Sequence, residues 1–109
     1  MQITHERVGD GILVHIRDEL GHHEARKAIH YLENIAVLYP VDPVALDLSG
    51  LTFMDSSGLA VVMNLHRALT RTGRRLTLLG TPPQAMRVFR AAGLPRLMTF
   101  IDGKGEKQC

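Results

Sequence analysis

Two short apolar runs on either side of a long helical pattern constrain the fold of this chain more than any other feature. Residues 44–48 and 75–79 are short, apolar and bounded by turn residues, which is typical of buried strands. Residues 56–72 between them repeat their apolar positions with the period of a helix. Two strands joined through one helix run parallel, with a right-handed crossover. The sequence therefore predicts an α/β fold in which a small mixed sheet packs against helices.

The N-terminal half adds an antiparallel strand pair and a helix. Residues 3–8 and 12–17 are strand candidates, and a Gly-Asp-Gly sequence at 9–11 is typical of the turn of a hairpin. We expect residues 18–23 to turn into a helix that ends before Pro40, because proline cannot continue it. The expected inner stripe of this helix is Ala25, Ala28, Ile29, Leu32 and Ala36.

In the middle of the chain, residues 49–55 are expected to form a loop that leads into the helix over 56–72. Gly73 lies where a left-handed C-terminal cap of that helix belongs. The side chains expected to face the core are Leu59, Val62, Met63, His66 and Leu69.

A third helix and a last strand complete the predicted order β-β-α-β-α-β-α-β. Thr81 is expected as the N-cap of this helix, Pro82 at its first position and Gln84 as the second half of a capping box. The last strand is expected over 97–101. The polar residues 102–109 are expected to be a frayed tail.

Length and composition indicate one domain over residues 1–109. Hydrophobic residues make up 45% of the chain, so it can bury a core without disulfides or metals. Cys109 is its single cysteine, which fits a reducing compartment. We find no signal-peptide pattern and no apolar run long enough to cross a bilayer, and we expect a cytoplasmic protein that binds no membrane. The net charge is only +2 and the chain has no Trp, so nucleic-acid binding is not expected.

The segment Phe53-Met54-Asp55-Ser56-Ser57-Gly58-Leu59 is the candidate functional site. Asp55 is placed to cap the helix by accepting the free amides of Ser57 or Gly58. Ser56 and Ser57 then lie in the first turn, near unpaired backbone amides and the positive end of the helix dipole, where a phosphate is tolerated within the folded domain. Gly58 lets another backbone or a ligand approach closely. Residue chemistry alone leaves two interpretations open: a binding or modification site, or a structural helix cap.

Enzyme and metal chemistry have weaker support. A Gly-x-Ser-x-Gly nucleophile motif and a phosphate-binding glycine loop with lysine are both absent from the sequence. His22 and His23 are adjacent and so point in different directions, while His30 and His66 stand alone on helices. We therefore expect no metal site, no cofactor and no enzymatic activity. A small hydrolase that uses Ser56 lacks a matched base.

The string Leu51-Thr52-Phe53-Met54-Asp55-Ser56-Ser57-Gly58-Leu59 resembles the signature of STAS domains that act as anti-sigma factor antagonists. The resemblance extends outward to Glu19-Leu20-Gly21-His22-His23 and to Ala91-Ala92-Gly93-Leu94, and it covers roughly residues 3–101. It is nearest to the members that antagonise the anti-sigma F factor in sporulation. The resemblance implies a STAS-type fold and a regulatory protein of transcription.

The resemblance also implies a mechanism. The unphosphorylated antagonist binds an anti-sigma factor that is itself a serine/threonine kinase, and this releases a sigma factor. The kinase phosphorylates the serine that matches Ser56, and a serine phosphatase of the metal-dependent class removes the phosphate. Members of the family act as monomers towards the kinase.

The residues that the resemblance places at the partner-binding surface surround the serine. Asp55 frames the acceptor, Ser57 and Gly58 shape the docking corner, and five further positions are contact candidates. These five are Gly21, His22, His23, Thr52 and Met54.

Two features depart from the family pattern. Gly21 stands where members usually carry Asp, and residues 102–109 are too polar for the C-terminal helix that members usually have. An alternative therefore stays open: a STAS module that binds a partner or senses a ligand without control by phosphorylation.

Overall fold

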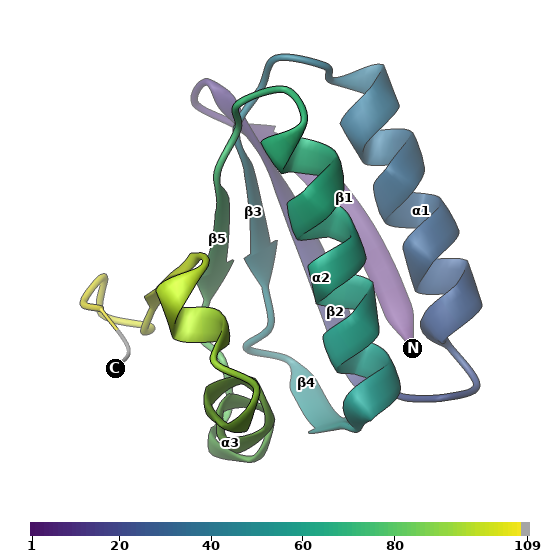
Figure 1. Ribbon diagram of the computed structural model, residues 1–109, viewed down its shortest axis with the longest axis vertical. Helices are drawn as coiled ribbons and strands as arrows, with labels where there is room; N and C mark the ends of the chain where they lie inside the picture. The colour runs from purple at the N-terminus through teal and green to yellow at the C-terminus, as the bar shows by residue number, and fades with distance from the viewer. Residues whose placement is uncertain (108–109) are drawn as a thin grey trace.

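The computed structural model describes residues 1–107, which form a mixed six-stranded sheet and three α-helices (Figure 1). The strands are β1 Gln2–Val8, β2 Gly11–Leu20, β3 Val44–Asp47, β4 Leu51–Met54, β5 Leu76–Leu79 and β6 Thr99–Ile101. The helices are α1 Ala25–Leu38, α2 Ser56–Thr70 and α3 Pro83–Ala91, with a 3₁₀ turn at Leu94–Arg96. The predicted α/β class and the mixed sheet against helices are confirmed.

The sheet has the order β1-β2-β3-β5-β6, and β4 pairs with β2 outside this series. Among the strands of the described residues, only β1 and β2 pair antiparallel; the pairs β2–β3, β2–β4, β3–β5 and β5–β6 are parallel. The predicted N-terminal hairpin and the parallel pair formed by β3 and β5 are therefore confirmed.

Strand β2 is long enough to hold two different neighbours on one edge. Its first half pairs with β3 from Ile12 to His15, and its second half pairs with β4 from Asp18 to Leu20. The register shifts between Asp18 and Glu19, where Asp18 has a positive φ of 71°. This irregularity turns the last residues of β2 towards β4.

Figure 1 shows α1 and α2 side by side over one face of the sheet and α3 at the end of the sheet, near β4; the core lies between the helices and the sheet. Along β2, Ile12, Val14 and Ile16 are buried while the residues between them are partly exposed, the alternation of a strand covered on one side. The helical apolar residues buried in this core are Ala28, Leu32, Ile35 and Ala36 of α1, Val61, Val62, Leu65 and Leu69 of α2, and Ala85, Met86 and Phe89 of α3.

Residues 49–55 were expected to form a loop and residues 18–23 a turn, and both expectations are wrong in part. Residues 51–54 form β4, and β2 continues to Leu20 because these two segments pair with each other. The element order is therefore β-β-α-β-β-α-β-α-β. This extra strand ends immediately before the Asp55-Ser56 corner.

The inner stripe of α2 differs from the expected one. The fully buried positions are Gly58, Val61, Val62, Leu65 and Leu69, whereas Leu59, Met63 and His66 are only partly buried. The helix is rotated because Gly58, rather than a large side chain, lies against β2 and β4 in its first turn. The left-handed cap is confirmed, since Gly73 has a φ of 70°.

The start of α3 also differs from the expectation. Its N-cap is Pro82, without a side-chain cap hydrogen bond, and Pro83 is the first helical residue. Gln84 does not complete a capping box, because its amide binds the backbone of Met54 instead.

The C-terminal segment differs in two places. The last strand begins at Thr99, because 94–96 form the 3₁₀ turn. In place of a frayed tail, residues 102–107 form a turn in which the Asp102 carboxylate accepts the amides of Lys104 and Glu106. Residues 108 and 109 lie outside the described part.

Candidate functional site

Three segments meet at the Ser56 corner, where β4 ends at Met54 and α2 begins at Ser56. They are the end of β4, the first turn of α2, and the bend at 21–24 that joins β2 to α1, which passes beside the start of α2 (Figure 1). The Asp55 carboxylate joins these segments. Its Oδ1 accepts from the Ser57 amide at 2.8 Å, and its Oδ2 accepts from the His22 amide at 3.2 Å. The predicted N-cap is confirmed, and the cap also fixes the β2–α1 bend.

The Asp55 carboxylate is held in its charged form. Its partial desolvation opposes ionisation, but the backbone amides of Ser57, His22 and Gly58 and the nearby His22 side chain together lower its pKa below the ordinary 3.8. A fixed negative charge therefore lies next to the two serines at neutral pH.

Gly58 is buried at the point where α2 lies closest to the sheet. A Cβ at this position would lie 2.3 Å from Met54 Cγ and 2.7 Å from the Leu20 carbonyl oxygen. The close approach that the sequence indicated is thus made by the protein's own β2 and β4. Gly58 shapes the corner from inside and offers no surface to a partner in this conformation.

The two serines differ in exposure. Ser56 is exposed at the first position of α2, whereas Ser57 is half-buried and its amide is engaged by Asp55. A modifying enzyme can therefore reach the Ser56 hydroxyl more easily than that of Ser57.

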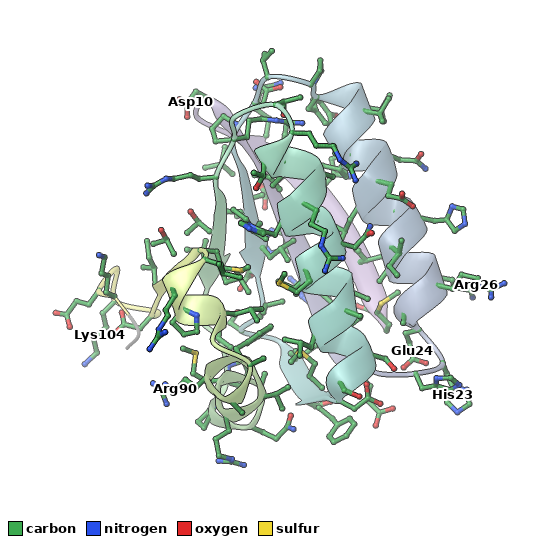
Figure 2. All side chains as sticks on the ribbon, in the orientation of Figure 1. Asp10, His23, Glu24, Arg26, Arg90 and Lys104 are labelled. Atoms are coloured by element: carbon green, nitrogen blue, oxygen red, sulfur yellow. The ribbon has the colours of Figure 1, made fainter. Side chains whose placement is uncertain are left out.

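The other contact candidates divide into exposed and buried residues. His22, His23 and Thr52 are exposed, and the His22 and His23 rings stack edge to face at 5.6 Å. Figure 2 shows His23 and Glu24 projecting outwards at the end where α1 begins, opposite the end that carries Asp10. Gly21 and Met54, in contrast, are buried, so the expectation that they offer contact surface is wrong.

Gly21 is buried because Asp55 occupies the space beside it. A Cβ at position 21 would lie 3.1 Å from Asp55 Oδ2. Any side chain there would press against the carboxylate that caps α2. The absence of a side chain leaves Asp55 free to accept the His22 amide.

Two residues at this corner have roles that the sequence did not indicate, although Phe53 lies within the candidate segment 53–59. Phe53 is 44% exposed on β4, only three residues before Ser56. Gln84 reaches Met54 from α3. An aromatic residue in a segment expected to be a loop was a usable signal for Phe53. No local pattern could connect Gln84 with a strand 30 residues away.

Within 1–107, no three His, Cys, Asp or Glu side chains gather as a metal ion would require. A cavity of about 520 Å³ is lined by Leu76, Met98 and Phe100 together with Arg75 and Arg96, and none of its residues belongs to the Ser56 corner. Among the described helices, none is both long and apolar enough to cross a membrane.

Comparison with known proteins assigns the family. The profile of the STAS domain matches residues 2–106. The chain belongs to the STAS domain family. The anti-sigma F factor antagonist of Paenibacillus polymyxa is 25% identical over 104 residues, which are 95% of this chain and 89% of that protein. The protein of the same name from Lysinibacillus sphaericus is 30% identical over 83 residues, 76% of this chain and 71% of that protein.

A solved structure agrees with the fold. The Bacillus cell fate determinant SpoIIAA in its phosphorylated form superposes with a TM-score of 0.72 and 25% identity, covering 94% of each chain. The three α-helices on a mixed sheet are thus the SpoIIAA-like arrangement of this STAS domain.

Proposed function

We propose that this STAS domain is an anti-sigma factor antagonist whose binding is switched off by phosphorylation of Ser56. The observation that carries the proposal is the exposed Ser56 hydroxyl beside an Asp55 carboxylate that is held ionised. The names of the two relatives and the phosphorylated form of SpoIIAA support the same function.

The switch acts through local charge. Phosphate adds about −1.5 to −2 charges at neutral pH. The Ser57 amide in the first turn of α2 is already used by Asp55, so the new charge gains no partner from this amide. In a docked interface this uncompensated charge lies beside Asp55, and a penalty of about 3 kcal/mol lowers affinity roughly a hundredfold. The fold itself need not change.

The partner in this proposal is an anti-sigma factor that is also a serine/threonine kinase, and a metal-dependent serine phosphatase reverses the reaction. The docking surface consists of the exposed residues around Ser56. Phe53 is its natural anchor because exposed aromatic side chains often provide most of the binding energy of an interface. Thr52, His22 and His23 surround it. No catalytic role is assigned to this chain, which acts as substrate and binding partner.

Phosphorylation of single-serine variants tests the proposal. The wild-type chain and the variants Ser56→Ala and Ser57→Ala are incubated with the cognate anti-sigma kinase and ATP, and intact masses are measured. We expect one phosphate on the wild type and on Ser57→Ala, and none on Ser56→Ala, because Ser56 is exposed whereas Ser57 is half-buried. A phosphate on Ser56→Ala contradicts the assignment of the acceptor.

Binding separates this function from its alternatives. We expect the kinase to bind Ser56→Asp at least tenfold more weakly than wild type, since the variant carries part of the added charge. Equal binding of both chains supports a STAS module that does not depend on phosphorylation. Covalent labelling of Ser56 by a serine-directed fluorophosphonate supports a hydrolase instead.

A further inference from the structure

The unpaired edge of β4 is closed by a side chain. Among the described strands, β4 pairs only with β2, which leaves its other edge without a strand neighbour. Gln84 fills this position at Met54. Its Oε1 accepts from the Met54 amide at 2.9 Å, and its Nε2 donates to the Met54 carbonyl at 2.8 Å. One primary amide thus makes both hydrogen bonds that an adjoining strand would make to this residue.

The side-chain amide of Gln84 is held in place by helix α3. Gln84 lies in the first turn of α3, and the next two residues, Ala85 and Met86, are buried in the core. The helix therefore cannot shift without disturbing the core, and the position of Met54 is tied to it.

Met54 in turn determines the start of α2. It directly precedes Asp55, the residue that caps α2 and binds the His22 amide. Its side chain also fills the space against Gly58, where an added Cβ would lie 3.1 Å from its sulfur. A shift of Met54 would therefore move both the cap and the first turn, which together present Ser56.

We propose that Gln84 is a positioning residue that links α3 to the Ser56 corner and holds the corner in its docking geometry. Its effect is transmitted through Met54 to Asp55, and it touches neither the phosphate nor the partner. This inference rests on the proposed function for its consequence in binding, but the structural link can be measured on the chain alone.

Amide hydrogen exchange of the variant Gln84→Glu tests the link. Glutamate keeps the length and the oxygen that accepts from the Met54 amide, but it replaces the N–H that donates to the Met54 carbonyl with a second oxygen. We expect the amide of Ser57, which reports the Asp55 cap, to exchange about tenfold faster than in wild type. If only the Met54 amide changes and Ser57 does not, the inference is wrong.

Val88→Ala is the matched control on the same helix. Val88 is partly buried against the core, so its truncation destabilises α3 without removing the Gln84 hydrogen bonds. We expect it to lower the melting temperature but leave the Ser57 exchange rate unchanged relative to global unfolding. If Ser57 exchange is accelerated equally in both variants, Gln84 only stabilises the fold in general and the inference is wrong. If Gln84→Glu does not fold, Gln84→Met, which has similar length and no amide, serves in the same comparison.

Affinity for the anti-sigma kinase then tests the functional consequence. At a temperature where all chains are folded, we expect Gln84→Glu to bind the kinase about five- to tenfold more weakly and Val88→Ala to bind like wild type. Unchanged affinity of Gln84→Glu contradicts a role in docking. If the wild-type chain binds no such kinase, the proposed function fails, while the exchange data still decide whether Gln84 positions the corner.

Discussion

Gly58 is the residue with the least room at the Ser56 corner. An alanine there gains helix propensity worth about 1 kcal/mol, since glycine is a poor helix former. Its Cβ would, however, meet Met54 Cγ at 2.3 Å and the Leu20 carbonyl at 2.7 Å. The carbonyl belongs to β2 and cannot move aside as a flexible side chain can. Overpacking costs about 1 to 3 kcal/mol, and a contact with a backbone atom that cannot move aside belongs in the upper part of that range, so the clash outweighs the gain.

We therefore predict that Gly58→Ala lowers the free energy of unfolding by about 1 to 2 kcal/mol, as measured by urea denaturation. Gly103→Ala is the control, because a Cβ at Gly103 meets nothing within 4 Å. The control should stay within about 0.5 kcal/mol of wild type. Equal stability of Gly58→Ala and wild type would show that the helix start relaxes more easily than its packing indicates.

For single residues, the sequence predicted the local role of a side chain better than its contacts with distant segments. The capping role of Asp55 and the close approach at Gly58 follow from residue type and position, and both are confirmed. The second bond of Asp55 to the His22 amide could not be predicted, because it joins residues 33 positions apart. Burial of Met54 and Gly21 has the same origin, since the segments that cover them are distant in sequence.

At the scale of elements, periodicity was informative where a segment is long and packs on one side. It predicted α1, the buried strands β3 and β5, and the hairpin of β1 and β2. It missed β4, a segment of four residues in which Thr52 and Phe53 are both exposed, so the alternation of a half-buried strand is absent. Only pairing with the far half of β2 makes this segment a strand.

The C-terminal end of α1 depends on an arginine from another element. Arg74 follows the C-terminal cap of α2, and its guanidinium donates to the backbone carbonyls of Ala36, Tyr39 and Asp42 and, through Nε, to the Thr72 hydroxyl. The last carbonyls of a helix lack partners within the helix. The guanidinium of Arg74 supplies hydrogen-bond donors to the C-terminal end of α1 and so joins α1 to the end of α2.

We predict that Arg74→Lys lowers the free energy of unfolding by about 1 to 3 kcal/mol, because a single ammonium group cannot reach all four acceptors. Urea denaturation measures the change, and Arg71→Lys on the exposed surface of the chain serves as control. The control should lie within about 0.5 kcal/mol of wild type. A similar small change in both variants would mean that water replaces the Arg74 hydrogen bonds without cost.

At the scale of the whole molecule, the face of the sheet away from the helices is held together by polar contacts. His15 on β2 is hydrogen-bonded through Nδ1 to Asp47 of β3 and through Nε2 to Glu6 of β1, each at 2.7 Å. Asp47 also accepts from the amide and hydroxyl of Ser49. One side chain thus links three adjacent strands on the face of the sheet away from α1 and α2.

The charge state of this network makes stability depend on pH. The hydrogen bond to Glu6, followed by that to Asp47, raises the pKa of His15 above the ordinary 6.5. Burial opposes ionisation of Asp47, but its bonds from Ser49 and His15 lower its pKa below 3.8. The contribution of His15 is therefore complete below about pH 6.5 and is lost as pH rises through its folded pKa. That of Asp47 is present above about pH 4 and is lost in acid. The network of His15, Asp47 and Glu6 therefore stabilises the fold most between about pH 4 and about pH 6.5.

We predict that His15→Gln is more harmful at pH 5.5 than at pH 8.5. Glutamine preserves polarity but cannot carry the charge that attracts Glu6 and Asp47. The difference in unfolding free energy between wild type and variant should be greater at pH 5.5 by on the order of 0.5 to 1 kcal/mol, a small value because Glu6 is largely exposed. Urea denaturation at both pH values measures it, with His30→Gln on the exposed surface of α1 as the matched control. A difference that is equal at both pH values, or greater at pH 8.5, would mean that His15 links the three strands as a neutral ring and that its charge adds nothing to the fold.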